Sequence, residues 1–221
     1  MIYGVVLDMD GTLCDTEVVW RDVAFQVAAE LGVELPVETY LAIVGLPGPV
    51  GRVRFGELAA VDFPVERWFS LTEARAVAAC ALGVPLKPGV HELLDVLEQQ
   101  EVPVAVCTSS THRGVQRHLG GTGVLERLVG VVAQGDYVLG KPSSEPYLKA
   151  AALLGVEPFA CLAVEDSENG VRSAAAAGCV TVLVPDLSPL APDVRALCAH
   201  VLPDLHAVAA MLSSSARSRT A

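Results

Sequence analysis

Apolar residues follow two different patterns along the chain. From about residue 85 onward, short apolar runs without a polar face alternate with segments of helical periodicity, which is typical of α/β proteins with parallel strands covered on both sides. The sequence therefore predicts a doubly wound, mostly parallel sheet. After the first strand at residues 5–7, the expected strands are 102–110, 128–134, 161–167 and 180–186, and the expected helices are 91–100, 112–119, 147–155 and 169–178.

The stretch between the first strand and residue 85 shows helical periodicity and no convincing strand. Apolar residues recur every four positions from Val19 to Leu31, and Gly32 follows as a helix stop. Further helices are expected over residues 39–45 and from about 64 to 82, and the tail 213–221 is expected to be frayed. We predict a Rossmann-like core domain of residues 1–15 and 85–221, with a small all-helical cap domain, residues 16–84, inserted after the first strand.

Polar residues gather at the carboxyl ends of the expected strands. Asp8 and Asp10 follow the first strand, and because extended chain alternates, they lie on one face. An ordinary turn at Asp10-Gly11 is the simpler alternative. The other strand-end residues are Thr108, Ser109 and Ser110 after the second strand, Lys141 after the third, and Glu165 and Asp166 after the fourth. In an open parallel sheet these ends meet at one edge, where crowded carboxylates take up protons or hold a hard cation such as Mg²⁺.

Composition narrows the classes of partner and location. Fifteen basic and 26 acidic residues give a net charge of −11, which disfavours nucleic acid and anionic membranes as partners. We find no apolar run near the ~20 residues of a membrane span and no secretory signal. Six scattered cysteines without a C-x-x-C pair indicate reduced, mostly buried thiols. These features predict a cytoplasmic protein. The sequence does not determine the oligomeric state, and a monomer is compatible with it.

Four short motifs give a specific resemblance. DMDGTLCD, CTSS, GKP and VEDSENG begin at residues 8, 107, 140 and 164, and in order and spacing they resemble the four motifs of haloacid dehalogenase-like (HAD) hydrolases. The resemblance is greatest to the β-phosphoglucomutase-like and phosphoglycolate phosphatase-like branch, which carries a helical cap after the first motif. It implies a Mg²⁺-dependent phosphatase that hydrolyses a small phosphorylated metabolite through an aspartyl-phosphate.

The resemblance also implies a role for each motif residue. Asp8 would be the nucleophile, and Asp10 the acid that protonates the leaving oxygen and the base that activates water. Thr108 would hydrogen-bond the phosphoryl group, and Lys141 would neutralise its charge. The implied metal ligands are Asp8, Asp166, the backbone carbonyl of Asp10, and Glu165 directly or through a water. The candidate substrate contacts are Gly11, Ser109, Ser110 and, in the cap, Arg52.

Two alternatives to a phosphatase stay open at this point. A phosphomutase would share every motif, but that branch tends to carry an arginine three residues after a cap glycine, whereas Gly45-Leu46-Pro47 is followed by Gly48. Arg52, one turn further on, is the substitute that the sequence offers. A receiver domain of signalling proteins also combines clustered acids, a hydroxyl and a lysine, although the predicted cap and the second aspartate argue against it.

Overall fold

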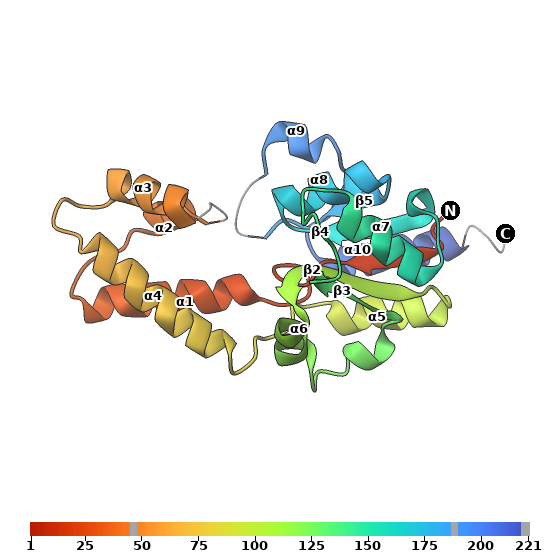
Figure 1. The fold of residues 1–221 in the computed structure, drawn as a ribbon, viewed down its shortest axis with the longest axis horizontal. Helices are drawn as coiled ribbons and strands as arrows, with labels where there is room; N and C mark the ends of the chain where they lie inside the picture. Colours follow the sequence, from red (N-terminus) through yellow and green to blue (C-terminus); the bar gives the residue numbers. More distant parts are fainter. Residues whose placement is uncertain (45–47, 187–189, 218–221) are drawn as a thin grey trace. The chain divides into compact units, whose positions relative to one another are not determined.

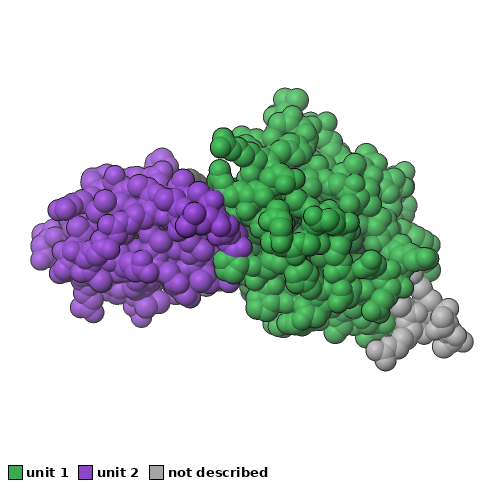
Figure 2. Space-filling view, turned by 90° about the horizontal axis from the view of Figure 1, so that it is seen from below, with its two compact units in different colours: residues 1–14, 85–221 green, residues 15–84 purple. Residues whose placement is uncertain are grey.

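The chain folds into two compact units. The computed structural model describes residues 1–44, 48–186 and 190–217. Residues 1–14 and 85–221 form unit 1, and residues 15–84 form unit 2 (Figure 2). No helix within the described ranges is long and apolar enough to cross a membrane.

Unit 1 is built on a parallel sheet, which confirms the predicted α/β fold class. In the part of the chain that the structure describes, the sheet has six strands in the order β3-β2-β1-β4-β5-β6. All of their pairings are parallel. The strands are β1 Gly4–Leu7, β2 Val104–Thr111, β3 Gly130–Gln134, β4 Cys161–Glu165, β5 Val180–Leu183 and β6 His200–Val201. Every residue of β1 and β4 is buried, which explains why these strands lack alternation.

Helices cover both faces of the sheet. In Figure 1, α7 and α8 lie above the strands and α5 lies below them; α7 packs against α8, and α5 packs against α10. The helices of unit 1 are α5 Val90–Gln99, α6 His112–Leu119, α7 Glu145–Leu154, α8 Glu168–Ala177, α9 Pro192–Arg195 and α10 Leu205–Arg217, with short 3-10 turns at Leu125–Arg127 and Pro158–Ala160. The six cysteines are free thiols, five of them buried, as expected.

Unit 2 is helical, with an aromatic core. Its helices are α1 Thr16–Glu30, α2 Val37–Leu41, α3 Gly48–Leu58 and α4 Val65–Cys80, and α1 packs along α4. Phe55 of α3 stacks on Trp68 of α4 with ring centres 4.5 Å apart, and Phe63 meets both rings edge-on. The indole N–H of Trp68 donates to the carbonyl of Ala24 in α1 at 2.9 Å. These contacts join α1, α3 and α4 into one core.

Some predicted elements differ from the structure. The prediction of a frayed tail from residue 213 is wrong over 213–217, which continue α10, because the helix buries Leu205, Val208 and Leu212; residues 218–221 lie outside the described part. The predicted helix at 39–45 is α2, which ends at Leu41, and Gly45 is not among the described residues. Helix α3 was not expected, since its glycines and proline give no apolar stripe. Its formation depends on tertiary packing, because Phe55 is fully buried. The sequence also gave no sign of α9 or β6.

Candidate active site

The turn after β1 presents the first carboxylate and brings the chain close to the fourth strand. Asp8 is buried, and its amide donates to the carbonyl of Val164 in β4 at 3.0 Å. Gly11 has a φ of +88°, which favours glycine. A Cβ on Gly11 would also collide with the carboxylate of Asp166. The glycine of the first motif therefore allows the β1 turn to approach the carboxylate that follows β4.

Lys141 lies between two carboxylates. Its ammonium group donates to Asp8 Oδ1 at 2.5 Å, to Glu165 Oε1 at 2.6 Å and to the carbonyl of Cys107 at 3.0 Å. Only 5% of the lysine side chain is exposed. Burial alone would lower the pKa of Lys141, but the charges of Asp8 and Glu165 outweigh it and raise that pKa. The lysine therefore remains an ammonium ion that donates to both acids.

Glu165 has both oxygens satisfied by the chain itself. Oε1 accepts from Lys141 and, at 2.7 Å, from the hydroxyl of Tyr147 in α7. Oε2 accepts from the amide of Asp166 at 3.2 Å and from the hydroxyl of Ser167 at 3.1 Å. A side chain on Gly170 would collide with this carboxylate. Glu165 is thus held by its neighbours as the anchor of Lys141.

Three carboxylates form a cluster that fits a divalent cation. One oxygen each from Asp8, Glu165 and Asp166 lies within 4.8 Å of the others. Burial raises the pKa of Asp8, opposed by Lys141 and reinforced by Glu165. Burial and the charges of Asp8 and Glu165 likewise raise the pKa of Asp166. One ammonium group does not balance three acids, so this all-oxygen set is suited to a hard ion such as Mg²⁺.

The end of β2 places hydroxyl groups beside the first motif. Ser110 Oγ donates to Asp10 Oδ2 at 2.7 Å and so orients that carboxylate. The hydroxyl of buried Thr108 accepts from the amide of Ser110 at 3.0 Å and can still donate its own hydrogen. Ser109 is exposed. Another hydroxyl, that of Thr12, donates to Asp166 Oδ1 at 3.2 Å.

Unit 1 thus brings together the predicted residues of all four motifs, and its contacts add three that sequence reasoning missed. Tyr147 binds Glu165, Thr12 binds Asp166, and Gly170, expected only to start a helix, lies against Glu165. The remaining predicted residue, Arg52, lies in unit 2, where it pairs with acids of α4. Residues Gly45-Leu46-Pro47, which bear on the phosphomutase alternative, lie outside the described part.

A family model described as haloacid dehalogenase-like hydrolase matches residues 2–178. The chain belongs to this family. Protein CbbY of Rhodobacter capsulatus is 32% identical over 226 residues, covering 91% of this chain and 98% of the relative. Hexitol phosphatase B of Escherichia coli K12 is 27% identical over 198 residues, covering 83% of this chain and 84% of the relative. Family membership confirms the resemblance, identifies the protein as a hydrolase and removes the receiver-domain alternative.

The fold extends the likeness to nearly the whole chain. A HAD family hydrolase of Deinococcus radiodurans, solved with bound phosphate and sodium, is 26% identical with a TM-score of 0.81, covering 97% of this chain and 96% of that one. A protein of Thermotoga maritima described as a putative β-phosphoglucomutase has a TM-score of 0.71 at 22% identity, and this likeness concerns the fold alone. Each of these two matches covers more than nine-tenths of both chains.

Proposed function

We propose that the protein is a Mg²⁺-dependent phosphatase that hydrolyses the monophosphate of a sugar or sugar alcohol through an aspartyl-phosphate. The observation that carries the proposal is the ammonium group of Lys141 at 2.5 Å from Asp8 Oδ1, with Asp166 and Glu165 in the same carboxylate cluster. Hexitol phosphatase B, among the relatives, supports the class of substrate. The division into units supports a core domain with unit 2 as its cap.

Asp8 is the proposed nucleophile. One of its carboxylate oxygens attacks phosphorus, the bond between phosphorus and the ester oxygen breaks, and an aspartyl-phosphate forms. Lys141, held by Glu165, to which Tyr147 also donates, neutralises charge on Asp8 and on the phosphoryl oxygens. The hydroxyl of Thr108 and the amides that follow Asp8 and lie at Ser109 hold those oxygens in place. The amide of Gly11 donates to the carbonyl of Cys14 at 2.9 Å, so Gly11 contributes by letting the turn approach Asp166.

Asp10 is the proposed general acid and base. Held by Ser110, its carboxyl group protonates the leaving oxygen of the substrate as the ester bond breaks. The resulting carboxylate then takes a proton from a water molecule, whose oxygen attacks phosphorus. The bond between Asp8 and phosphorus breaks, and phosphate and the free Asp8 carboxylate are released.

Asp8 and Asp166, with the backbone carbonyl of Asp10, are the proposed ligands of Mg²⁺. Glu165 has both oxygens engaged by Lys141, Tyr147 and its own strand end, so we assign it to the surroundings of the ion, acting through a water. When bound, the cation would offset the repulsion between Asp8 and a phosphate dianion and polarise the phosphoryl oxygens.

A panel of phosphorylated sugars and sugar alcohols, assayed for phosphate release with and without Mg²⁺, tests this function. We expect release that requires Mg²⁺ and is lost in Asp8→Asn, because an amide is a poor nucleophile. The matched control is Asp22→Asn, an exposed aspartate that pairs with Arg21, which should keep wild-type rates. Conversion of a sugar phosphate to its isomer without phosphate release would favour a phosphomutase, and phosphate release by Asp8→Asn at the wild-type rate would refute the assignment.

A further inference from the structure

Unit 2 contains a pocket of its own, with a volume of about 340 Å³, which is within the range of small-molecule sites. Its walls are mostly aromatic and aliphatic. The apolar lining residues are Trp20, Tyr40, Ile43, Val44, Trp68 and Phe69, and the polar ones are Glu17, Arg52, Thr72 and Glu73. The side chains come from α1, α3, α4 and residues 40–44, so the packing of unit 2 forms the pocket.

Negative charge outweighs positive charge around this pocket. Arg52 is the single cation among the described lining residues, whereas Glu17 and Glu73 both contribute carboxylates. The guanidinium of Arg52 donates to Glu66 at 3.0 Å and to Glu73 at 3.4 Å, and it lies 4.7 Å from the ring centre of Phe69. Two carboxylates, those of Glu66 and Glu73, therefore already pair with the one guanidinium. A phosphate group entering here would be repelled by these two carboxylates and would have to compete with them for Arg52.

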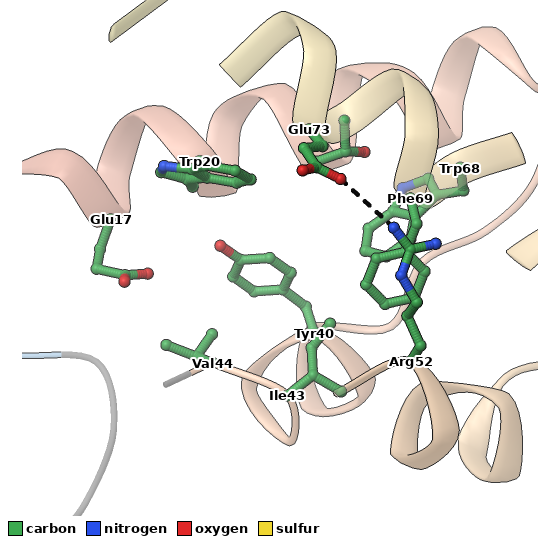
Figure 3. Close-up of a pocket in the computed structure, with 10 residues that line it drawn as sticks. Glu17, Trp20, Tyr40, Ile43, Val44, Arg52, Trp68, Phe69 and Glu73 are labelled. Atoms are coloured by element: carbon green, nitrogen blue, oxygen red, sulfur yellow. Dashed lines mark hydrogen bonds and ion pairs between the residues drawn. The ribbon is translucent and has the colours of Figure 1, made fainter. Parts of the chain in front are cut away.

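The other lining groups are suited to an uncharged, hydroxyl-bearing molecule. Figure 3 shows the Trp20 and Tyr40 rings across from each other, with the carboxylate of Glu17 on one side and that of Glu73 on the other. Aromatic faces bury the C–H surfaces of a ligand, and carboxylates accept hydrogen bonds from its hydroxyl groups. A carbon chain or ring with several hydroxyls satisfies both kinds of wall.

We propose that this pocket binds the uncharged polyhydroxylated part of a sugar or sugar-alcohol monophosphate, and that Glu66 and Glu73 make it reject a second phosphate by holding Arg52. The inference rests on the proposed function for its class of substrate. It adds that Arg52 determines specificity, because Glu66 and Glu73 pair with it and so prevent it from binding phosphate. A bisphosphate, which a phosphomutase must retain as an intermediate, is the ligand that this pocket disfavours.

Tryptophan fluorescence can test the proposal without turnover. The chain has two tryptophans, and both Trp20 and Trp68 line the pocket, so its occupancy should alter the emission. In Asp8→Asn protein, glucitol 6-phosphate and glucitol 1,6-bisphosphate provide a pair that differs by one phosphate. We expect the monophosphate to bind about tenfold or more tightly than the bisphosphate, with a signal that falls in Trp20→Phe.

Variants assign the selection to the Arg52 pairs. Glu73→Gln should reduce the preference for the monophosphate over the bisphosphate to about threefold or less, because it removes one carboxylate and one of the two ion pairs of Arg52. In the double variant Glu73→Gln/Arg52→Gln, the bisphosphate should again bind more weakly, because the guanidinium that Glu73→Gln makes available is gone. The matched control is Glu57→Gln, because Glu57 pairs with Arg54 on an exposed surface and does not line the pocket; its preference should equal that of the parent.

Each outcome bears on the proposal separately from the phosphatase assignment. Equal or tighter binding of the bisphosphate, an unchanged preference in Glu73→Gln, or no emission change with either ligand would overturn the pocket assignment. The phosphatase assignment is decided by phosphate release from wild-type protein. Since the titration uses protein in which Asp8 is replaced, loss of one assignment leaves the other measurable.

Discussion

The active site of unit 1 and the pocket of unit 2 each set one cation among carboxylates, but they differ in burial. The side chain of Lys141 is 5% exposed and that of its partner Glu165 is fully buried, whereas Arg52 is 34% exposed and its partner Glu66 is 81% exposed. Buried charges interact strongly and shift pKa values, while exposed pairs are screened by water and interact more weakly. The same arrangement can therefore hold catalytic groups in unit 1 and adjust ligand choice in unit 2.

Chelation gives the largest expected effect. EDTA should reduce phosphate release to background, because Asp8, Glu165 and Asp166 with one ammonium cannot accept a phosphate dianion without a cation. Added Mg²⁺ should restore activity, and Zn²⁺ should restore it poorly at an all-oxygen site. Binding of glucitol, which carries no phosphate, to the unit 2 pocket should by contrast be insensitive to EDTA when it is followed by tryptophan fluorescence. Full phosphatase activity in metal-stripped protein would contradict the role given to the carboxylate cluster.

Lys141→Met tests the buried cation. Activity should fall by about 10²–10³, as for loss of one preorganised donor to a developing charge. Unfolding in urea should show a loss of roughly 3–5 kcal/mol, because the buried carboxylates lose their partner. The matched control is Lys149→Met, since Lys149 is an exposed lysine on α7, and its rate and stability should stay near wild type. If Lys141→Met lowers activity no more than this control, burial does not distinguish the two cations.

Much of the active site could be predicted because strand ends are visible in sequence. Fully apolar runs mark β1 and β4, and the polar residues just beyond them, including Asp8 and Asp166, must lie at one edge of a parallel sheet. The contact of Tyr147 with Glu165 could not be predicted in the same way. It depends on how α7 is rotated against the sheet, and in the sequence a buried aromatic residue of this helix cannot be told from an ordinary core residue.

The pocket of unit 2 was much less visible in the sequence. Helices α1 and α4 have clear periodicity, but α3, which carries Arg52, has none. The pairs of Arg52 with Glu66 and Glu73 join α3 to two turns of α4, so they depend on packing around Phe55. The sequence could indicate Arg52 as a candidate substrate contact, but it could not indicate the two glutamates that form ion pairs with it.

Tyr147→Phe gives the smallest expected loss within unit 1, because it removes a hydroxyl and leaves Lys141 in place. Burial raises the pKa of Tyr147, so its hydroxyl stays protonated and donates to Glu165. We expect a loss of roughly 10–100-fold in activity or in apparent affinity for Mg²⁺, typical of groups that orient a metal site. Mg²⁺ titrations of the rate measure both. Exposed Tyr3 offers the control Tyr3→Phe, and equal behaviour of the two variants would remove Tyr147 from the site.

The central claim is that Asp8 carries the phosphoryl group and Asp10 moves the protons, and one rapid-mixing experiment on Asp10→Asn tests it. p-Nitrophenolate leaves readily without an acid, so p-nitrophenyl phosphate should give a fast burst of about one equivalent, followed by a stall in hydrolysis. Mass spectrometry of the stalled protein should find one phosphoryl group on the peptide that contains Asp8. With glucitol 6-phosphate, the burst of glucitol release should be slower than in wild-type protein by a factor of about 10²–10⁴. Equal slowing of both bursts, or phosphate on another residue, would contradict the account.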